Sequence, residues 1–273
     1  MTAPEAASGA AERIEAAARR LLDAAATGTP CAPVRDLIGA TDQERAYQVQ
    51  AAVNAYRTAG GQRVVGHKIG LTSPAVQAQL GVGSPDFGTL FGDMAYADRE
   101  PMPLSRFLQP RVEAEIAFVL GRDLDVPSPT VADVVRATDH VLAAVEVVDS
   151  RIAGWDITIA DTIADNASSG AFVLGTAPKR LADVDLPGAG MVLEHRGEPV
   201  SVGAGVACLG SPVAAVVWLA RALGRLGTPL RAGEVVLSGA LGPVVAVTAP
   251  GAFRARISGV GEVTAVFDEG SPA

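Results

Sequence analysis

Two glutamates stand two positions apart in a stretch whose alternation predicts a β-strand, residues 109–120. Side chains on a strand alternate between its faces, so Glu113 and Glu115 project from the same face. The opposite face is apolar: Val112, Ala114, Ile116, Phe118 and Leu120. Burial and mutual repulsion both penalise two adjacent ionised carboxylates, and a cation bound between them removes that penalty. The alternative is an edge strand whose polar face meets water.

A third carboxylate, Glu146, interrupts the apolar run 141–149. A glutamate inside a central strand is paired, protonated or metal-bound. We therefore expect Glu146 to join Glu113 and Glu115 as a metal ligand, the alternative being a single protonated side chain in the core. Three carboxylates without a dedicated His or Cys favour Mg²⁺ or Mn²⁺ over Zn²⁺.

Acid–base candidates precede the carboxylates in the chain. Lys68 lies between apolar neighbours in the strand-like stretch 63–71, where it is either partly buried or snorkels to solvent. Asp86 lies in 84–94, whose Pro and Gly predict a loop and whose Phe and Leu predict that the loop is packed. Later in the chain, Ser168 falls in a turn of small residues, 167–170, and Ser238 in a Gly-rich turn, 237–243, that can offer backbone N–H groups to a carboxylate.

Bulk composition excludes several classes of protein. The chain has 273 residues, 49% of them hydrophobic, and a net charge of −8, which argues against a nucleic-acid partner. Cys31 and Cys208 lie in no ligand motif, which favours a reduced, cytoplasmic compartment. The N-terminus has no secretory pattern, and no apolar run reaches the length expected of a membrane span.

The elements that position these residues begin with an N-terminal helical part, residues 11–62, after a loose tail at 1–10. A helix over 11–26 is followed by one that Thr41 and Glu44 open as a capping box. Ser73 is expected to cap a short helix that ends at residue 81. A helix from Thr130 to about residue 139 leads into the Glu146 strand, and a helix capped by Ser211 interrupts the strands of the last third.

Mostly antiparallel strands with few helices predict an α+β fold, with a mixed, mostly antiparallel sheet folded on itself and an N-terminal helical layer. The sheet would form a catalytic domain over 63–268. Asp161 and Asp165, one turn apart on a predicted helix, are expected to lie on a solvated face.

Six motifs occur in the order found in one known family: 66–73, 83–90, 109–117, 146–151, 161–170 and 237–242. Together they resemble the 2-keto-4-pentenoate (2-hydroxypentadienoate) hydratase family, which includes 4-oxalocrotonate decarboxylase and belongs to the fumarylacetoacetate hydrolase superfamily. The likeness runs from about residue 11 to about residue 268. It implies the superfamily fold, a Mg²⁺ or Mn²⁺ ion, a homo-oligomer, and a catabolic role at the end of aromatic-ring meta-cleavage.

The resemblance also assigns roles. It places the metal carboxylates on Glu113, Glu115 and Glu146 and the catalytic pair on Lys68 and Asp86. Substrate-binding positions fall on Ser168, Ser238 and Gly239, with a serine at 238 where the family often has threonine.

The resemblance implies hydration of 2-hydroxypenta-2,4-dienoate to 4-hydroxy-2-oxopentanoate. Three alternatives remain. A 4-oxalocrotonate-type decarboxylase needs an extra cation for its second carboxylate, and no second Lys or Arg beside Lys68 stands out. A C–C hydrolase needs a His–Glu pair, but alternation turns His67 away from the side that Lys68 faces. The last is a non-catalytic, metal-stabilised subunit that partners a related pathway enzyme.

Overall fold

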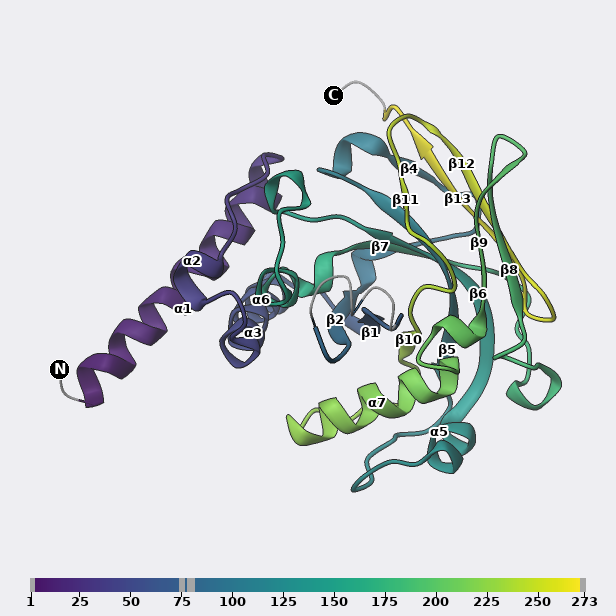
Figure 1. The fold of residues 1–273 in the computed structure, drawn as a ribbon, viewed down its shortest axis with the longest axis horizontal. Helices are drawn as coiled ribbons and strands as arrows, with labels where there is room; N and C mark the ends of the chain where they lie inside the picture. The colour runs from purple at the N-terminus through teal and green to yellow at the C-terminus, as the bar shows by residue number, and fades with distance from the viewer. Residues whose placement is uncertain (1–2, 74–76, 78–81, 271–273) are drawn as a thin grey trace.

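The computed structural model describes residues 3–73, 77 and 82–270. It contains two β-sheets on one side and a group of helices on the other (Figure 1). Except for Gln77, which is helical, the helix expected after Ser73 lies outside the described residues.

The larger sheet has eight strands in the order β2-β1-β10-β5-β6-β7-β3, with β11 paired to β5. Most neighbours are antiparallel, while β1–β10 and β3–β7 are parallel pairs. The bounds are β1 Val64–Gly70, β2 Asp86–Phe91, β3 Ala95–Tyr96, β5 Arg111–Leu120, β6 Thr138–Val148, β7 Ser169–Leu174, β10 Val235–Leu237 and β11 Val245–Ala246.

The smaller sheet has five strands in the order β4-β13-β12-β8-β9. It packs across the larger sheet, where β13 and β12 contact β6 and β8 contacts β5. Its strands are β4 Pro101–Pro103, β8 Gly190–His195, β9 Glu198–Ala204, β12 Gly251–Ile257 and β13 Gly261–Asp268. The predicted α+β fold with a mixed, mostly antiparallel sheet folded on itself is confirmed.

Strand β5 shows how the sequence pattern directs this packing. Its predicted apolar side chains all enter the main hydrophobic core, together with side chains of β8, β12 and β13. The other face of β5 carries Ala117 into a separate cluster with Leu142 and Ala144 of β6. Glu113 and Glu115 continue that second face toward the start of the strand, so the alternation predicted for β5 is confirmed.

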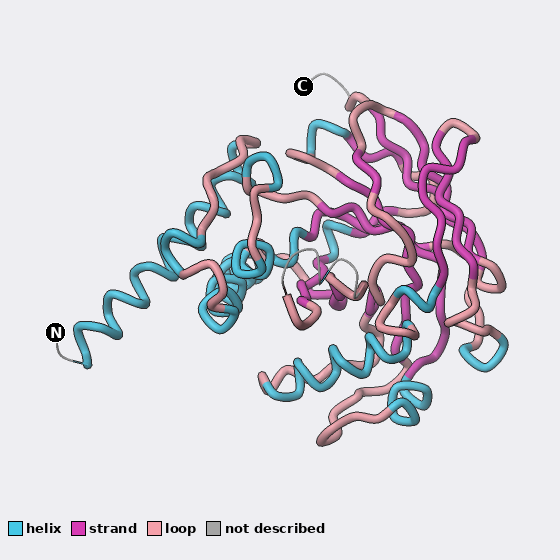
Figure 2. The backbone as a smooth tube through the Cα atoms, in the orientation of Figure 1, coloured by secondary structure: helices cyan, strands magenta, loops and turns pink. Residues whose placement is uncertain are grey.

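The helical layer consists of α1 Ala3–Thr27, α2 Arg35–Ile38, α3 Gln43–Ala59 and α6 Ile159–Ala164 (Figure 2). Helix α1 begins within the expected tail, at Ala3, because the alanine-rich sequence favours helix throughout this region. Helix α3 is capped by Asp42 rather than Thr41: the Asp42 side chain accepts from the backbone N–H of Arg45. The four helices share one apolar cluster, which also includes Ile152, and the proposed domain boundary at residue 63 stays a prediction.

The two aspartates expected on a solvated face are both buried, so that expectation was wrong. Asp161 accepts from the backbone N–H groups of Val34 and Arg35, both at 2.9 Å, and thereby ties α6 to the start of α2. Asp165 forms an ion pair with Arg151. Their partners come from distant or irregular segments, which helical periodicity does not reveal.

The remaining helices are α5 Val131–Ala137 and α7 Pro212–Arg225. Contrary to expectation, the segment Gly205–Arg225 meets the length and hydropathy of a membrane span, with a mean hydropathy of 1.8. More than half of it is buried in the protein, and Ala215, Val216 and Leu219 of α7 belong to the main core. These are the properties of a core helix.

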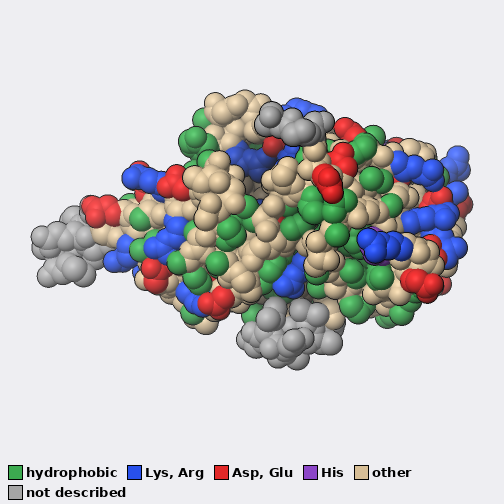
Figure 3. All heavy atoms as spheres, turned by 90° about the horizontal axis from the view of Figure 1, so that it is seen from above, with side chains coloured by type: hydrophobic (Ala, Val, Ile, Leu, Met, Phe, Trp, Pro, Cys, Tyr) green, Lys and Arg blue, Asp and Glu red, His purple; other side chains and the backbone are tan. Residues whose placement is uncertain are grey.

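On the face seen in Figure 3, acidic and basic side chains are interleaved.

Candidate active site

Three glutamates converge at one end of the larger sheet. Glu113 of β5 and Glu146 of β6 are direct partners in the antiparallel register. Glu115 lies two residues along the same face of β5. One carboxylate oxygen from each lies within 4.8 Å of the other two, as a shared cation requires.

The hydrogen bonding of these carboxylates fits a metal ion. Glu115 and Glu146 are buried, yet Glu115 Oε1 and Glu146 Oε2 have no hydrogen-bond donor within the described part of the chain, while Glu146 Oε1 lies 3.1 Å from the Lys68 ammonium. Orphaned buried carboxylate oxygens are costly unless a cation binds them. The all-oxygen set suits a hard divalent ion such as Mg²⁺ or Mn²⁺.

The pKa values of the glutamates show the same cost of placing buried carboxylates side by side. Burial, reinforced by the charge of Glu146, raises the pKa of Glu113 from its usual 4.5 to about 7. Burial and the charges of Glu146 and Glu113 hold the pKa of Glu115 well above its usual range. Without a cation, this cluster therefore binds protons at neutral pH.

Lys68 and Asp86 lie beside the glutamates. Strand β1 carries Lys68, and its buried Nζ is 3.1 Å from Glu146 Oε1. Burial alone would lower the pKa of Lys68, but the charges of the surrounding carboxylates, Glu146 first, raise it above its ordinary value. The ammonium form is therefore favoured, and solvent snorkelling is excluded because the side chain is 4% exposed.

Asp86 begins strand β2 and does not lie in the expected loop. Its Pro- and Gly-rich stretch pairs with β1, which satisfies the backbone groups, and Asp86 is the partner of Gly70. A Cβ at Gly70 would lie 2.1 Å from Asp86 Oδ1 and 3.6 Å from Lys68 Nζ, so the absent side chain leaves room for the pair. Burial raises the pKa of Asp86, while Lys68 opposes that shift.

Ser168 lies in a left-handed turn near Lys68 and Asp86. Asn166, Ala167 and Ser168 have φ values of 55°, 51° and 54°, which non-glycine residues rarely adopt in succession. The Asn166 side chain accepts from the Thr89 N–H at 2.8 Å and donates to the Thr89 carbonyl at 2.9 Å, which fixes the turn to β2. Thr162, absent from the sequence-based site, links the two parts: its hydroxyl lies 3.4 Å from both Asp86 Oδ2 and Ser168 Oγ.

The Gly-rich turn after β10 contacts the metal ligands directly. The Gly239 N–H donates to Glu115 Oε2 at 2.8 Å. The backbone N–H of this turn therefore binds a carboxylate of the protein itself. Ser238 is fully buried, and its hydroxyl has no partner among the described residues. Cys208 supports the turn, since its Sγ lies 2.9 Å from the Gly239 carbonyl oxygen.

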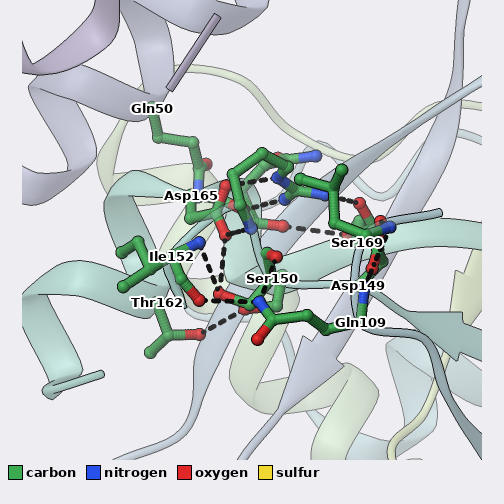
Figure 4. Close-up of polar contacts among 12 residues, drawn as sticks. Gln50, Gln109, Asp149, Ser150, Ile152, Thr162, Asp165 and Ser169 are labelled. Atoms are coloured by element: carbon green, nitrogen blue, oxygen red, sulfur yellow. Dashed lines mark hydrogen bonds and ion pairs between the residues drawn. The ribbon is translucent and has the colours of Figure 1, made fainter. Parts of the chain in front are cut away.

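A network of hydrogen bonds holds the loop that follows β6, from Asp149 to Ile152 (Figure 4). Gln109 Nε2 donates to the carbonyls of Ser150 and Ile152 at 3.0 and 2.8 Å. Asp149 accepts from the Gln109 N–H at 2.6 Å. Asp165 accepts from the Arg151 N–H at 2.9 Å. The loop that follows β6 is thus fixed against the start of β5.

Arg111 is a second cation that the sequence analysis missed. It starts β5 on the same face as Glu113 and Glu115, and its guanidinium stacks over the Trp155 ring at 4.1 Å. The alternation that paired the glutamates would have placed Arg111 beside them. His67, by contrast, faces away from Lys68 as expected, and burial lowers its pKa to about 4.

Comparison with known proteins agrees with this geometry. The fumarylacetoacetate (FAA) hydrolase C-terminal family matches residues 67–267. The chain belongs to the fumarylacetoacetate hydrolase family. The match includes all of the candidate site residues named above and nearly all of both sheets.

Within the fumarylacetoacetate hydrolase family, the chain has close relatives. It is 56% identical over 257 residues to the 2-keto-4-pentenoate hydratase of Paraburkholderia phymatum, covering 94% of this chain and 98% of the relative. It is 57% identical over 254 residues to the TodF product hydratase of Pseudomonas putida, covering 93% and 95%.

A solved structure in the family has nearly the same fold. This is the 4-oxalocrotonate decarboxylase from Pseudomonas putida G7, complexed with magnesium and adipate, which superposes with a TM-score of 0.90 at 34% identity. The match covers 94% of this chain and 98% of the decarboxylase.

Proposed function

We propose that this protein is a hydro-lyase that adds water to 2-hydroxypenta-2,4-dienoate and forms 4-hydroxy-2-oxopentanoate. The observation that carries the proposal is the identity of 56–57%, over nearly the whole chain, to relatives named as hydratases of this type. The three-glutamate cluster with an adjacent Lys–Asp pair supports the same chemistry.

Glu113, Glu115 and Glu146 would hold the divalent ion, Mg²⁺ or Mn²⁺. When bound, this ion supplies Lewis-acid polarisation of the ketone of a 2-oxo acid. The Gly239 N–H acts through Glu115, whose position it fixes, and the unpartnered Ser238 hydroxyl is placed to bind substrate.

Lys68 and Asp86 perform the proton transfers. Protonation of the dienoate at C5, with loss of the 2-hydroxyl proton, gives 2-oxopent-3-enoate. Water then adds at C4 while C3 gains a proton, so the net change is one water molecule. Lys68, held as an ammonium, is the proton donor, and Asp86, whose Oδ1 has no donor within the described residues, is the acceptor. Ser168 and Thr162 position the substrate beside Asp86.

The proposed setting is the catabolic end of aromatic meta-cleavage in a reduced cytoplasm, with the protein acting as a homo-oligomer that can associate with other enzymes of the pathway. Both cysteines, Cys31 and Cys208, are free thiols, which supports the reduced compartment.

The second candidate is decarboxylation of 4-oxalocrotonate. The fold of the solved decarboxylase favours it, and so does Arg111, because a second carboxylate needs a second cation. The sequence-based argument that no second cation stands out did not consider Arg111. The preference for hydration therefore depends on the relatives rather than on charge.

The deciding experiment supplies purified protein and Mg²⁺ or Mn²⁺ with 2-hydroxypenta-2,4-dienoate and 4-oxalocrotonate in separate reactions, with products identified by NMR. We expect kcat/KM for hydration to exceed that for decarboxylation by at least about tenfold. Rapid CO₂ release without 4-hydroxy-2-oxopentanoate would establish the decarboxylase instead. No turnover of either substrate would favour the non-catalytic partner subunit.

A further inference from the structure

Arg111 has an unusual combination of position and contacts. It is half-buried at the start of β5, two residues before Glu113 and on the same face. Its guanidinium stacks on Trp155, but no carboxylate or carbonyl among the described residues accepts its N–H groups. A guanidinium offers five donors in a planar fork that matches a carboxylate, so an unpaired one at a site is a ready anion receptor.

The Trp155 platform is held in place from several sides. The Trp155 Nε1–H donates to the Gln109 carbonyl at 3.1 Å, and the Gly154 N–H donates to Gln109 Oε1 at 2.7 Å. Gln109 in turn holds Ser150 and Ile152, as Figure 4 shows. A stacked, immobilised guanidinium loses little entropy when an anion binds.

The sheet topology places Arg111 at the same end as the catalytic groups. Strands β1 and β10 are parallel to each other, and β10 runs antiparallel to β5. The last residues of β1, the Gly-rich turn after β10 and the first residues of β5 therefore meet at one end of the sheet. Arg111 lies on the β5 side of this end, whereas Lys68 and Asp86 lie on β1 and β2.

Charge balance requires a further cation when the substrate is an acid. Three glutamates and Asp86 bring four negative charges when ionised, while Lys68 and a divalent ion bring three positive charges. An acid entering this site would meet a net negative charge. Arg111, two residues before Glu113 on the same face of β5, would offset that negative charge.

We infer that Arg111 binds the carboxylate of a 2-oxo acid substrate and so sets the direction in which the substrate lies. Accepting the proposed function, the carbons that exchange protons face Lys68 and Asp86 on β1 and β2. The carboxylate end of the substrate then faces β5, where the Arg111 guanidinium stacks on Trp155. A receptor for the substrate's only carboxylate is a different role from neutralising a distal second carboxylate.

The test measures binding without turnover. Mn²⁺-loaded wild type, Arg111→Gln and Arg111→Lys are titrated calorimetrically with 2-oxopentanoate, a saturated 2-oxo acid. We expect Arg111→Gln to weaken binding at least about tenfold, and Arg111→Lys to weaken it less, because the lysine keeps the charge and loses the fork. The Mn²⁺ dissociation constant should stay within about twofold of wild type. The matched control is Arg122→Gln, an exposed arginine just past the other end of β5, which should bind 2-oxopentanoate normally.

Three outcomes overturn the inference. Unchanged 2-oxopentanoate affinity in Arg111→Gln would show that Arg111 does not meet the carboxylate. Equal losses of Mn²⁺ and 2-oxopentanoate affinity would show that it acts only through Glu113. In a parallel titration with the dicarboxylate 2-oxohexanedioate, a loss of affinity confined to that ligand would assign Arg111 to a distal carboxylate. Because binding needs no reaction, an Arg111-dependent 2-oxopentanoate site in a protein that does not hydrate the dienoate would refute the proposed function and leave this inference standing.

Discussion

Lys68 is placed among more negative charge than one ammonium can balance. Glu146 is its nearest partner, and Asp86, Glu113 and Glu115 add to the field that keeps it protonated. An ion pair that served only stability would need one carboxylate. This excess supports the proposed role of Lys68 as a proton donor, because the surrounding charge keeps its side chain in the ammonium form.

Lys68→Met should bind Mn²⁺ at least as well as wild type yet lose activity by about 10²–10⁴-fold, because proton transfer typically contributes that much. Steady-state kinetics with a separate Mn²⁺ titration checks this. Lys179→Met, at an exposed position, is the control and should behave as wild type. Normal turnover in Lys68→Met would leave Lys68 a structural residue.

The pKa of Glu113 predicts how metal binding depends on pH. Below about 7, Mn²⁺ must displace the Glu113 proton, so its apparent affinity should rise about tenfold per pH unit for that group and lose this part of the slope above 7. Glu115, whose pKa lies well above its usual range, should maintain a residual slope. Calorimetric Mn²⁺ titration between pH 5 and 8 measures both.

The same raised pKa acts on folding with the opposite sign. Between the usual 4.5 and about 7, folded metal-free protein holds a proton on Glu113 that the unfolded chain has released. The stability of the metal-free protein should therefore fall as the pH rises through this window. A Glu113→Gln variant should lose this component of the pH dependence together with most of its metal affinity, whereas the exposed Glu198→Gln control should keep both.

Among the elements, the turn 166–168 combines backbone strain with a proposed positioning role. Three successive left-handed residues are tolerated because the Asn166 side chain occupies both backbone groups of Thr89. The strained turn holds the Ser168 hydroxyl 3.4 Å from that of Thr162, which also lies 3.4 Å from Asp86 Oδ2.

Asn166→Ala should reduce stability by about 1–3 kcal/mol, because two backbone groups of β2 lose their partner. Activity should fall further than stability explains, since Ser168 is no longer held. Ala167→Gly is the matched control. Glycine relieves the backbone strain of the left-handed conformation but makes the unfolded chain more flexible, so the free energy of unfolding should stay within about 1 kcal/mol of wild type. Denaturant unfolding and kinetics on the folded variants test this. Full activity in a destabilised Asn166→Ala protein would contradict the positioning role.

Much of β5 and its site could be predicted from sequence because the cause was local. Alternation paired Glu113 with Glu115, and an apolar run made Glu146 conspicuous. The direct pairing of Glu113 with Glu146 depends on strand register, which neither segment contains alone. Asp86 was assigned to a loop because Pro and Gly signal turns, whereas β1 supplies the pairing partners that make it a strand.

Other features depended on contacts between distant segments. Asp161 was expected in solvent because one helix turn cannot reveal that Val34 and Arg35 would cover it. Arg111 was overlooked for a different reason. A charged residue at the start of a strand is normally solvated, and only the position of Trp155 in space shows that this one is held.

At the scale of the whole molecule, Asp161 of α6 connects two helices of the helical layer, α6 and α2. It is fully buried, accepts from α2 and from the Thr158 N–H that precedes α6, and pairs with Arg35 at 3.0 Å. The same arginine pairs at 2.6 Å with Asp156, whose side chain is 68% exposed. One cation thus has a buried and an exposed partner.

Asp161→Ala should cost about 3–5 kcal/mol, because it leaves buried donors and a charge without their acceptor. Asp156→Ala removes the exposed partner and should cost no more than about 1 kcal/mol. Chemical unfolding gives both values, and hydrogen exchange should show the loss in Asp161→Ala concentrated in α2 and α6. Equal costs for the two variants would mean that the buried carboxylate does not anchor the layer.

The pairing of Glu113 opposite Glu146 has a consequence for how such a protein can change over generations. Like charges at directly opposed strand positions destabilise a sheet. The first substitution that abandons the metal, Glu113→Gln, should therefore make the metal-free protein more stable than the metal-free wild type, as thermal unfolding in a chelator would show. Drift toward stability alone would erase this site, so the glutamates persist in a lineage only while selection acts on what they bind.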